Sequence, residues 1–139
     1  MNALFTAIFT RYNDATAESI ALRAALTNKL HFYEPPQGTE FPYGIFFLVS
    51  NVPNDAFVEE FENATIQFSL FSSRETADDP ADEICDLYEK LDDVYNKCAL
   101  EGLVGYTLVS MLRETSSLLP LEDGVYQYNI DYRVLLEKT

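Results

Sequence analysis

The residues that could perform chemistry in this chain are few and poorly matched to one another. His31 is the single histidine, so one chain cannot assemble a histidine-based metal site. A Ser–His or Cys–His catalytic pair would have to use this one residue. The two cysteines, Cys85 and Cys98, lack the short spacing of metal and redox motifs. The five glycines form no phosphate-binding loop. We therefore do not expect an enzyme.

Carboxylates are plentiful, and some of them recur at helical spacing. Side chains three and four positions apart share one face of a helix, where they could line up as oxygen ligands for a hard cation. The ordinary alternative is a solvated helix face, which we favour. The residues concerned are Asp82, Asp86, Glu89 and Asp93. Because the acids cluster on elements that we expect to face solvent, paired-carboxylate catalysis is also disfavoured.

The net charge makes some classes of binding partner unfavourable. The chain has 9 basic and 23 acidic residues and a formal net charge of −14. Phosphate backbones repel such a protein, which disfavours specific binding to nucleic acid or to an anionic membrane. No apolar run reaches the roughly 18 residues of a membrane span, and the N-terminal stretch lacks the basic start and cleavage site of a signal peptide. We expect a cytosolic protein whose cysteines are buried thiols.

The clearest strand lies near the C-terminus of what we expect to be one domain over residues 1–139. Gly124–Leu136 alternates between apolar and polar residues. Successive side chains of a strand point to opposite faces, so this stretch predicts a long strand with one buried face and one wet face. The apolar set is Tyr126, Tyr128, Ile130, Tyr132, Val134 and Leu136, and the polar set is Gln127, Asn129, Asp131 and Arg133.

Further segments predict the rest of the sheet. Tyr43–Val49 is an apolar run typical of a central strand covered on both faces. Asn51–Asp55 predicts a turn, and Phe57–Ser72 predicts the strand that pairs antiparallel with the first. A bulge near Glu62–Asn63 is one possibility in that strand. Val104–Arg113 predicts another strand, apolar at nearly every position.

Three helices complete the prediction. Asn2–Tyr12 and Ala17–Leu26 read as short amphipathic helices, the second capped by Thr16. The longest, Pro80–Cys98, begins at the start signal Asp79-Pro80 and has apolar residues on one face for nearly four turns. The predicted fold class is α+β. It has an antiparallel, strongly twisted β-sheet of about four to five strands, with two short N-terminal helices and one long amphipathic helix packed on one face.

The segment Ser116–Asp123, predicted as the turn into the last strand, contains three leucines around a proline. Connecting segments run over the surface, and exposed apolar clusters usually mark interfaces. The alternative, which stays open, is that the leucines fold back over their own sheet. The polar side of the last strand could likewise contact a neighbouring subunit or simply face water. The candidate interface residues are Leu118, Leu119, Leu121, Gln127, Asn129 and Arg133.

The order of these segments resembles that of the tail completion proteins of long-tailed bacteriophages, also called tail terminator or tail-to-head joining proteins. The resemblance spans nearly the whole chain and rests on the order and spacing of short motifs. These are Pro36-Gln37-Gly38, Phe41-Pro42-Tyr43 with the apolar strand after it, Thr65–Phe71 with the following helix, Gly124-Val125-Tyr126, and Ile130-Asp131-Tyr132-Arg133-Val134.

That resemblance implies an α+β domain that assembles into a ring, usually a hexamer, at the head-proximal end of the tail tube. Such a ring ends tail polymerisation and joins the tail to the head, so its partners would be the tail tube protein and the head connector or stopper protein. DNA would pass through its lumen without specific binding. Neither catalysis nor a cofactor is implied. The protein would then be part of the virion and be assembled in the host cytoplasm.

Acidic walls would let DNA slide, because they repel phosphates. The candidate lumen residues are Asp55, Glu59, Glu60 and Glu62 in the hairpin tip, and Asp82, Asp86, Glu89 and Asp93 in the long helix. Three alternatives remain open. One is another neck, head-completion or minor tail protein. The second is a small acidic cytosolic binding module. The third is a small-molecule-binding domain whose aromatic sheet lines a pocket.

Overall fold

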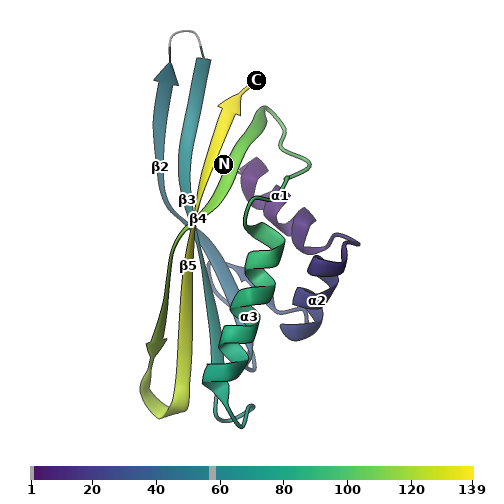
Figure 1. Ribbon diagram of the computed structural model, residues 1–139, viewed down its shortest axis with the longest axis vertical. Coiled ribbons are helices and arrows are strands. Elements are labelled where there is room, and N and C mark those ends of the chain that lie inside the picture. The colour runs from purple at the N-terminus through teal and green to yellow at the C-terminus, as the bar shows by residue number, and fades with distance from the viewer. Residues whose placement is uncertain (1, 57–58) are drawn as a thin grey trace.

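The computed structural model of the chain describes residues 2–56 and 59–139 and shows a five-stranded sheet with the helices on one face (Figure 1). The strand order is β1-β2-β3-β5-β4. The strands are β1 (Leu30–Phe32), β2 (Tyr43–Ala56), β3 (Glu59–Ser73), β4 (Tyr106–Pro120) and β5 (Val125–Lys138). The helices are α1 (Asn2–Tyr12), α2 (Ala17–Ala25), α3 (Pro80–Tyr95) and the short 3₁₀ helix η1 (Glu122–Gly124). The predicted α+β class is confirmed.

The sheet is mixed, so the prediction of a purely antiparallel sheet is wrong. The strands from β2 to β4 pair antiparallel with their neighbours, but β1 pairs with β2 in parallel, with Leu30 opposite Gly44. The loop 33–42 carries the chain from the end of β1 back to the level where β1 began, so β2 runs in the same direction. A three-residue strand is too short for its alternation to reveal a direction in the sequence.

Two long hairpins extend in opposite directions: the β2–β3 hairpin extends beyond the helices, whereas the β4–β5 hairpin ends near the level at which α3 begins (Figure 1). Strands β2 to β5 have 14 or 15 residues each, and at about 3.4 Å per residue each is roughly 50 Å long. The predicted turns at Asn51–Asp55 and Ser116–Asp123 are therefore wrong, because β2 continues to Ala56 and β4 to Pro120. The predicted start of the returning strand, Phe57, lies outside the described residues.

Prolines account for both errors. Proline lacks an N–H, yet an edge strand tolerates it where its missing donor would face solvent. Pro53 lies in the part of β2 that β1 does not reach, and Pro120 ends the edge strand β4. The bulge in the β2–β3 pair lies between Leu48 and Ser50, not near Glu62–Asn63.

The helices begin where the sequence predicts, but two of them end earlier. The side chains of Thr16 and Asp79 cap α2 and α3 as expected. Helix α2 ends one residue before Leu26, and α3 ends at Tyr95, not at Cys98. Asn96 is extended, with φ −71° and ψ 121°, and the Lys97 N–H donates to the Met111 carbonyl of β4 over 2.8 Å. The chain thus leaves α3 in order to reach the edge of the sheet.

The core lies between the helices and one face of the sheet, with Phe68 at its centre. Phe68 has no exposed surface, and its ring centroid lies 5.6 Å from that of Phe46, 4.7 Å from Tyr95 and 5.7 Å from Tyr132. Helix α3 packs over β3 and β5, in agreement with the prediction that the long helix packs on one face of the sheet. The buried side of β5 is confirmed at Ile130, Tyr132, Val134 and Leu136.

No helix formed by residues 2–56 and 59–139 lies on the other face of the sheet (Figure 1). The prediction that β2 is covered on both faces is therefore wrong. Tyr43, Ile45 and Phe47 lie partly exposed on this open face. The Tyr43 ring stacks on Phe71 of β3 with 4.9 Å between ring centroids. Cross-strand aromatic packing thus accounts for part of the apolar run that suggested a doubly buried strand.

Burial raises the pKa of several core tyrosines. The pKa of Tyr12 rises to about 12, and those of Tyr95 and Tyr132 are also raised. The Tyr95 hydroxyl donates to the Ile8 carbonyl over 2.9 Å. The Tyr132 hydroxyl donates to Asp92 Oδ1 over 2.8 Å, which adds to the effect of burial because it favours the neutral phenol.

We expect these tyrosines to make the fold sensitive to alkali. Below about pH 10 they are neutral in both the folded and the unfolded chain, so their stabilisation is fully present. Above that pH the unfolded chain loses protons that the folded chain retains. Each such tyrosine then lowers the free energy of unfolding by about 1.4 kcal/mol per pH unit. Urea titrations at pH 8 and pH 11 measure the fall. The variant Tyr132→Phe should show a shallower fall, and an unchanged slope would contradict the assignment.

Candidate functional site

The residues with catalytic potential lie apart in the fold. His31 is on β1, Cys85 is on the outer side of α3, and Cys98 follows that helix. Cys85 is exposed, contrary to prediction, because it lies off the apolar stripe of α3. Burial raises the pKa of the Cys98 thiol to about 11, so this thiol stays protonated near neutral pH and is a poor nucleophile.

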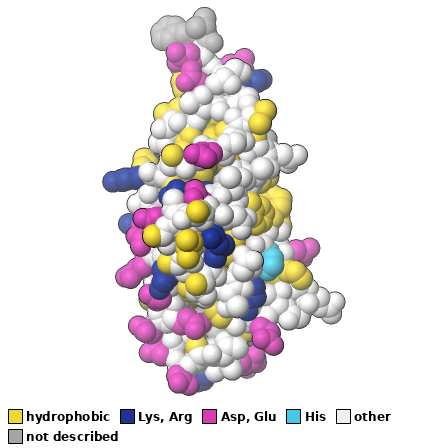
Figure 2. All heavy atoms as spheres, turned by 90° about the vertical axis from the view of Figure 1, so that its right-hand side faces the viewer, with side chains coloured by type: hydrophobic (Ala, Val, Ile, Leu, Met, Phe, Trp, Pro, Cys, Tyr) yellow, Lys and Arg dark blue, Asp and Glu magenta, His cyan; other side chains and the backbone are white. Residues whose placement is uncertain are grey.

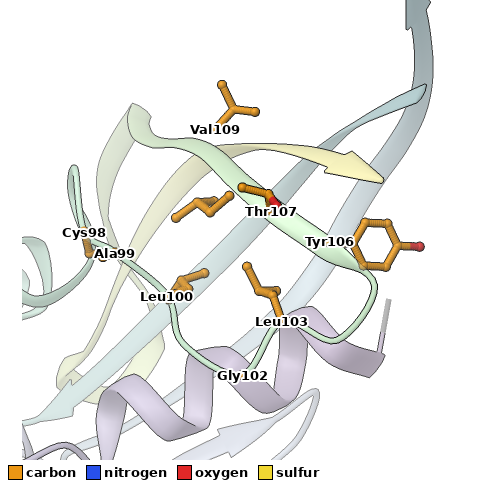
Figure 3. A pocket seen from close by; sticks show the side chains of 9 residues that line it. Cys98, Ala99, Leu100, Gly102, Leu103, Tyr106, Thr107 and Val109 are labelled. Atoms are coloured by element: carbon orange, nitrogen blue, oxygen red, sulfur yellow. The ribbon is translucent and has the colours of Figure 1, made fainter. Parts of the chain in front are cut away.

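A hollow of about 460 Å³ lies between the loop after α3 and the start of β4 (Figure 3). Leu100 and Leu103 lie beneath the strand, whereas Val109 points away from the loop. Small-molecule sites combine an apolar lining with a few convergent polar groups. The described residues that line this hollow include no carboxylate, imidazole or basic side chain.

The helix acids do not form a metal site. Within residues 2–56 and 59–139, no group of three or more His, Cys, Asp or Glu side chains is arranged to hold a metal ion. Asp86 forms an ion pair with Lys90, one turn along α3. In the same part of the chain, no helix is long and apolar enough to cross a membrane.

The two predicted acidic groups lie on different parts of the molecule. Asp55, Glu59, Glu60 and Glu62 belong to the part of the β2–β3 hairpin that extends beyond the helices, and the α3 acids lie toward the opposite end (Figure 1). Figure 2, which looks onto the helix side, shows acidic side chains near both ends. One copy of the chain therefore presents two acidic surfaces. The members on α3 are Asp82, Asp86, Glu89 and Asp93, and all four are exposed.

The hairpin acids face one another across the strands. Asp55 lies opposite Glu60, and Glu62 is the next member on the same face. Like charges directly opposite each other destabilise a strand pair. Among the described residues, the counter-charge is Lys138, whose Nζ lies 3.6 Å from Glu60 Oε2. One lysine leaves the end of the hairpin with excess negative charge.

The three candidate leucines remain exposed. Leu118, Leu119 and Leu121 have relative exposures of 38%, 42% and 45%. Leu118 lies opposite Tyr128, on the face that the helices cover further along, whereas Leu119 lies opposite Gln127 on the open face. The leucines therefore do not fold back over their own sheet, and they present apolar surface on both faces of the β4–β5 hairpin.

The polar side of β5 lies on the open face and is bound within the same copy. Asn129 Oδ1 accepts hydrogen bonds from Ser69 Oγ over 2.7 Å and from Gln127 Nε2 over 2.8 Å. Arg133 forms an ion pair with Glu114 of β4. Gln127, Asn129 and Arg133 therefore already bond to neighbours within one copy.

Sequence reasoning missed two unpaired strand edges. Strand β1 reaches β2 no further than Phe46, so the rest of β2 has β3 as its one strand neighbour among the described residues. In the described part of the chain, strand β4 pairs with β5 and with no other strand. Both stretches belong to runs without charge, residues 43–54 and 115–121, in a chain with 23% charged residues. The absence of charge was the signal that could have identified them.

Comparisons with known proteins show a likeness of fold. No protein-family model matches the sequence, and no curated protein matches it. Among solved structures, the chain is similar to one from the virion of a native gene transfer agent particle. The TM-score is 0.71 at 15% sequence identity, and the match covers 98% of this chain and 96% of that chain. At this identity the likeness shows a shared fold over nearly the whole length of both chains.

Proposed function

We propose that the protein is a structural component of a virion, where it caps the head-proximal end of the tail tube as a homo-oligomeric ring. The ring ends tail polymerisation and joins the tail to the head. The observation that carries this proposal is the fold shared with a chain of a gene transfer agent virion over 98% of the present chain. The order of sequence motifs, which resembles that of tail terminator proteins, supports the more specific role.

Features of the surface fit this role. The unpaired edges of β2 and β4 lie on opposite margins of the sheet, as a head-to-tail ring requires. The hairpins extend in opposite directions (Figure 1), so one can contact the tail tube protein while the other contacts the head connector or stopper protein. With a net charge of −14 per copy, the ring repels the DNA that passes through it. We propose a hexamer without catalytic activity or cofactor.

A second candidate function rests on the same shared fold. Because the matched structure is a whole virion, the likeness is equally compatible with another neck, head-completion or minor tail protein. The two functions differ in the defect that loss of the protein would cause. Tail length is the property that separates them.

Disrupting the gene in the particle-producing host tests the proposal. We expect overlong tails without heads in electron micrographs, because tube growth would lack its terminator. Supplying the wild-type gene in trans should restore tails of uniform length. Tails of normal length that lack heads would favour a neck or head-completion protein, and unchanged particles would refute both roles.

A further inference from the structure

Two edge segments without a strand partner lie on opposite margins of the sheet. We define the β2 edge segment as residues 47–52 and the β4 edge segment as residues 115–119; within the described residues, no strand pairs with their outer side. Such edges expose N–H and C=O groups that can pair with another chain. The adjacent part of β4 is already occupied, because Met111 accepts from the Lys97 N–H and Arg113 donates to Asn96 Oδ1.

The strand directions allow these segments to pair between copies. Strands β2, β3, β5 and β4 alternate in direction, so a neighbour in a similar orientation presents its β2 antiparallel to β4. The two segments also present matching faces of the sheet. Ser50 lies on the open face through Thr65 and Arg133, and Ser117 lies on the same face through Asn129. Pairing with Ser50 beside Ser117 would keep the open faces of both copies on one side.

Charge favours this contact over other parts of the surface. Copies with a net charge of −14 repel one another, and both edge segments are uncharged. In the antiparallel arrangement, the hairpin residues after Pro53 continue toward the middle of the neighbouring β4. Asp55 then approaches Lys97, which is exposed, and Arg113, which is exposed and already forms an ion pair with Asp92 in its own copy. A basic partner would relieve the repulsion between Asp55 and Glu60 within the hairpin.

We propose that the β2 edge segment of one copy pairs antiparallel with the β4 edge segment of the next copy. The partner is a second copy of this chain, and the sheet continues from copy to copy. The contact joins two different surfaces, so it is head-to-tail and closes into a ring when the rotation between copies allows it. This inference rests on the proposed function, because it supplies the contact that holds the ring together.

Disulfide crosslinking tests the contact. The variant carries Ser50→Cys and Ser117→Cys, with Cys85→Ser and Cys98→Ala to remove the native thiols. Both serines are exposed and form no side-chain hydrogen bond among the described residues. In purified particles that carry this variant, mild oxidation should convert the monomer band on a non-reducing gel into a ladder of multimers. Reduction should restore the monomer.

The matched control replaces Ser117→Cys with Thr107→Cys. Thr107 is exposed on the same face of β4, at the other end of the strand. We expect no ladder from Ser50→Cys with Thr107→Cys, and no dimer from Ser50→Cys alone. A dimer of the single variant would show that two β2 edges meet symmetrically and would overturn the proposal. Unchanged thermal melting of each variant confirms that the cysteines leave the fold intact.

The outcomes also separate this inference from the proposed function. If gene disruption gives overlong tails but the crosslinking variant gives no ladder, the ring exists and uses other surfaces, and the inference is wrong. If disruption leaves tails and heads unchanged, the proposed function is wrong. A ladder obtained in that case still supports the contact between copies.

Discussion

Replacing Phe68 with alanine is expected to lower the free energy of unfolding by about 3–5 kcal/mol. The Phe68 ring has no exposed surface and lies among the rings of Phe46, Tyr95 and Tyr132, which come from β2, α3 and β5. Its loss removes buried apolar area and leaves a cavity that three separate elements would have to move together to fill. Small domains have a total stability of about 5–15 kcal/mol, so the variant should be close to unfolding.

Urea denaturation monitored by circular dichroism measures this effect. The matched control is Phe71→Ala, three residues along the same strand, where the side chain is partly exposed on the open face. We expect the control to lose less than half as much stability, because water already reaches part of its ring. Equal losses at the two positions would show that the open face contributes as much to the core as the helix side does.

The second large effect is expected for assembly. Leu119→Asp places a charge on the exposed, uncharged part of β4, where Leu119 lies on the open face opposite Gln127. Burying an unpaired carboxylate between acidic copies costs several kcal/mol of binding free energy. We expect the variant to be absent from purified particles and the tails to become overlong. The unfolding free energy of the isolated chain should change by no more than about 0.5 kcal/mol, because the site is exposed in one copy.

Incorporation is measured by the amount of the protein in purified particles, and tail length by electron microscopy. The matched control is Val104→Asp, which adds the same charge at a side chain with 82% exposure in the loop before β4. Normal assembly of Leu119→Asp would contradict an interface at this leucine. An equal defect in Val104→Asp would show that added negative charge, and not its position, prevents assembly.

Local periodicity was sufficient to predict much of this fold. The alternation from Tyr126 to Leu136 identified the buried side of β5, and the start signal at Asp79 located the beginning of α3. These features depend on residues near each other in the chain, because the period of a strand or helix determines which side chains share a face. The packing of the long helix against the buried side of β5 followed from the same reasoning, since two apolar faces in one small domain must bury each other.

The candidate site was less predictable, because it depends on which strands have neighbours. Pro53 and Pro120 read as turn residues in the sequence, and only the register shows that they lie in strands with a free edge. The parallel pairing of β1 leaves the outer part of β2 without a partner, and no short-range pattern encodes that pairing.

The sequence by itself determined the composition of the surfaces: an excess of acids, two uncharged stretches and a cluster of leucines. The tertiary structure alone decided their arrangement. It placed the acids of the β2–β3 hairpin apart from those of α3, and it put Leu118 and Leu119 on opposite faces of one hairpin. The physical reason is that strand pairing joins residues far apart in the chain, so exposure and edge position follow from register, which local residue patterns do not specify.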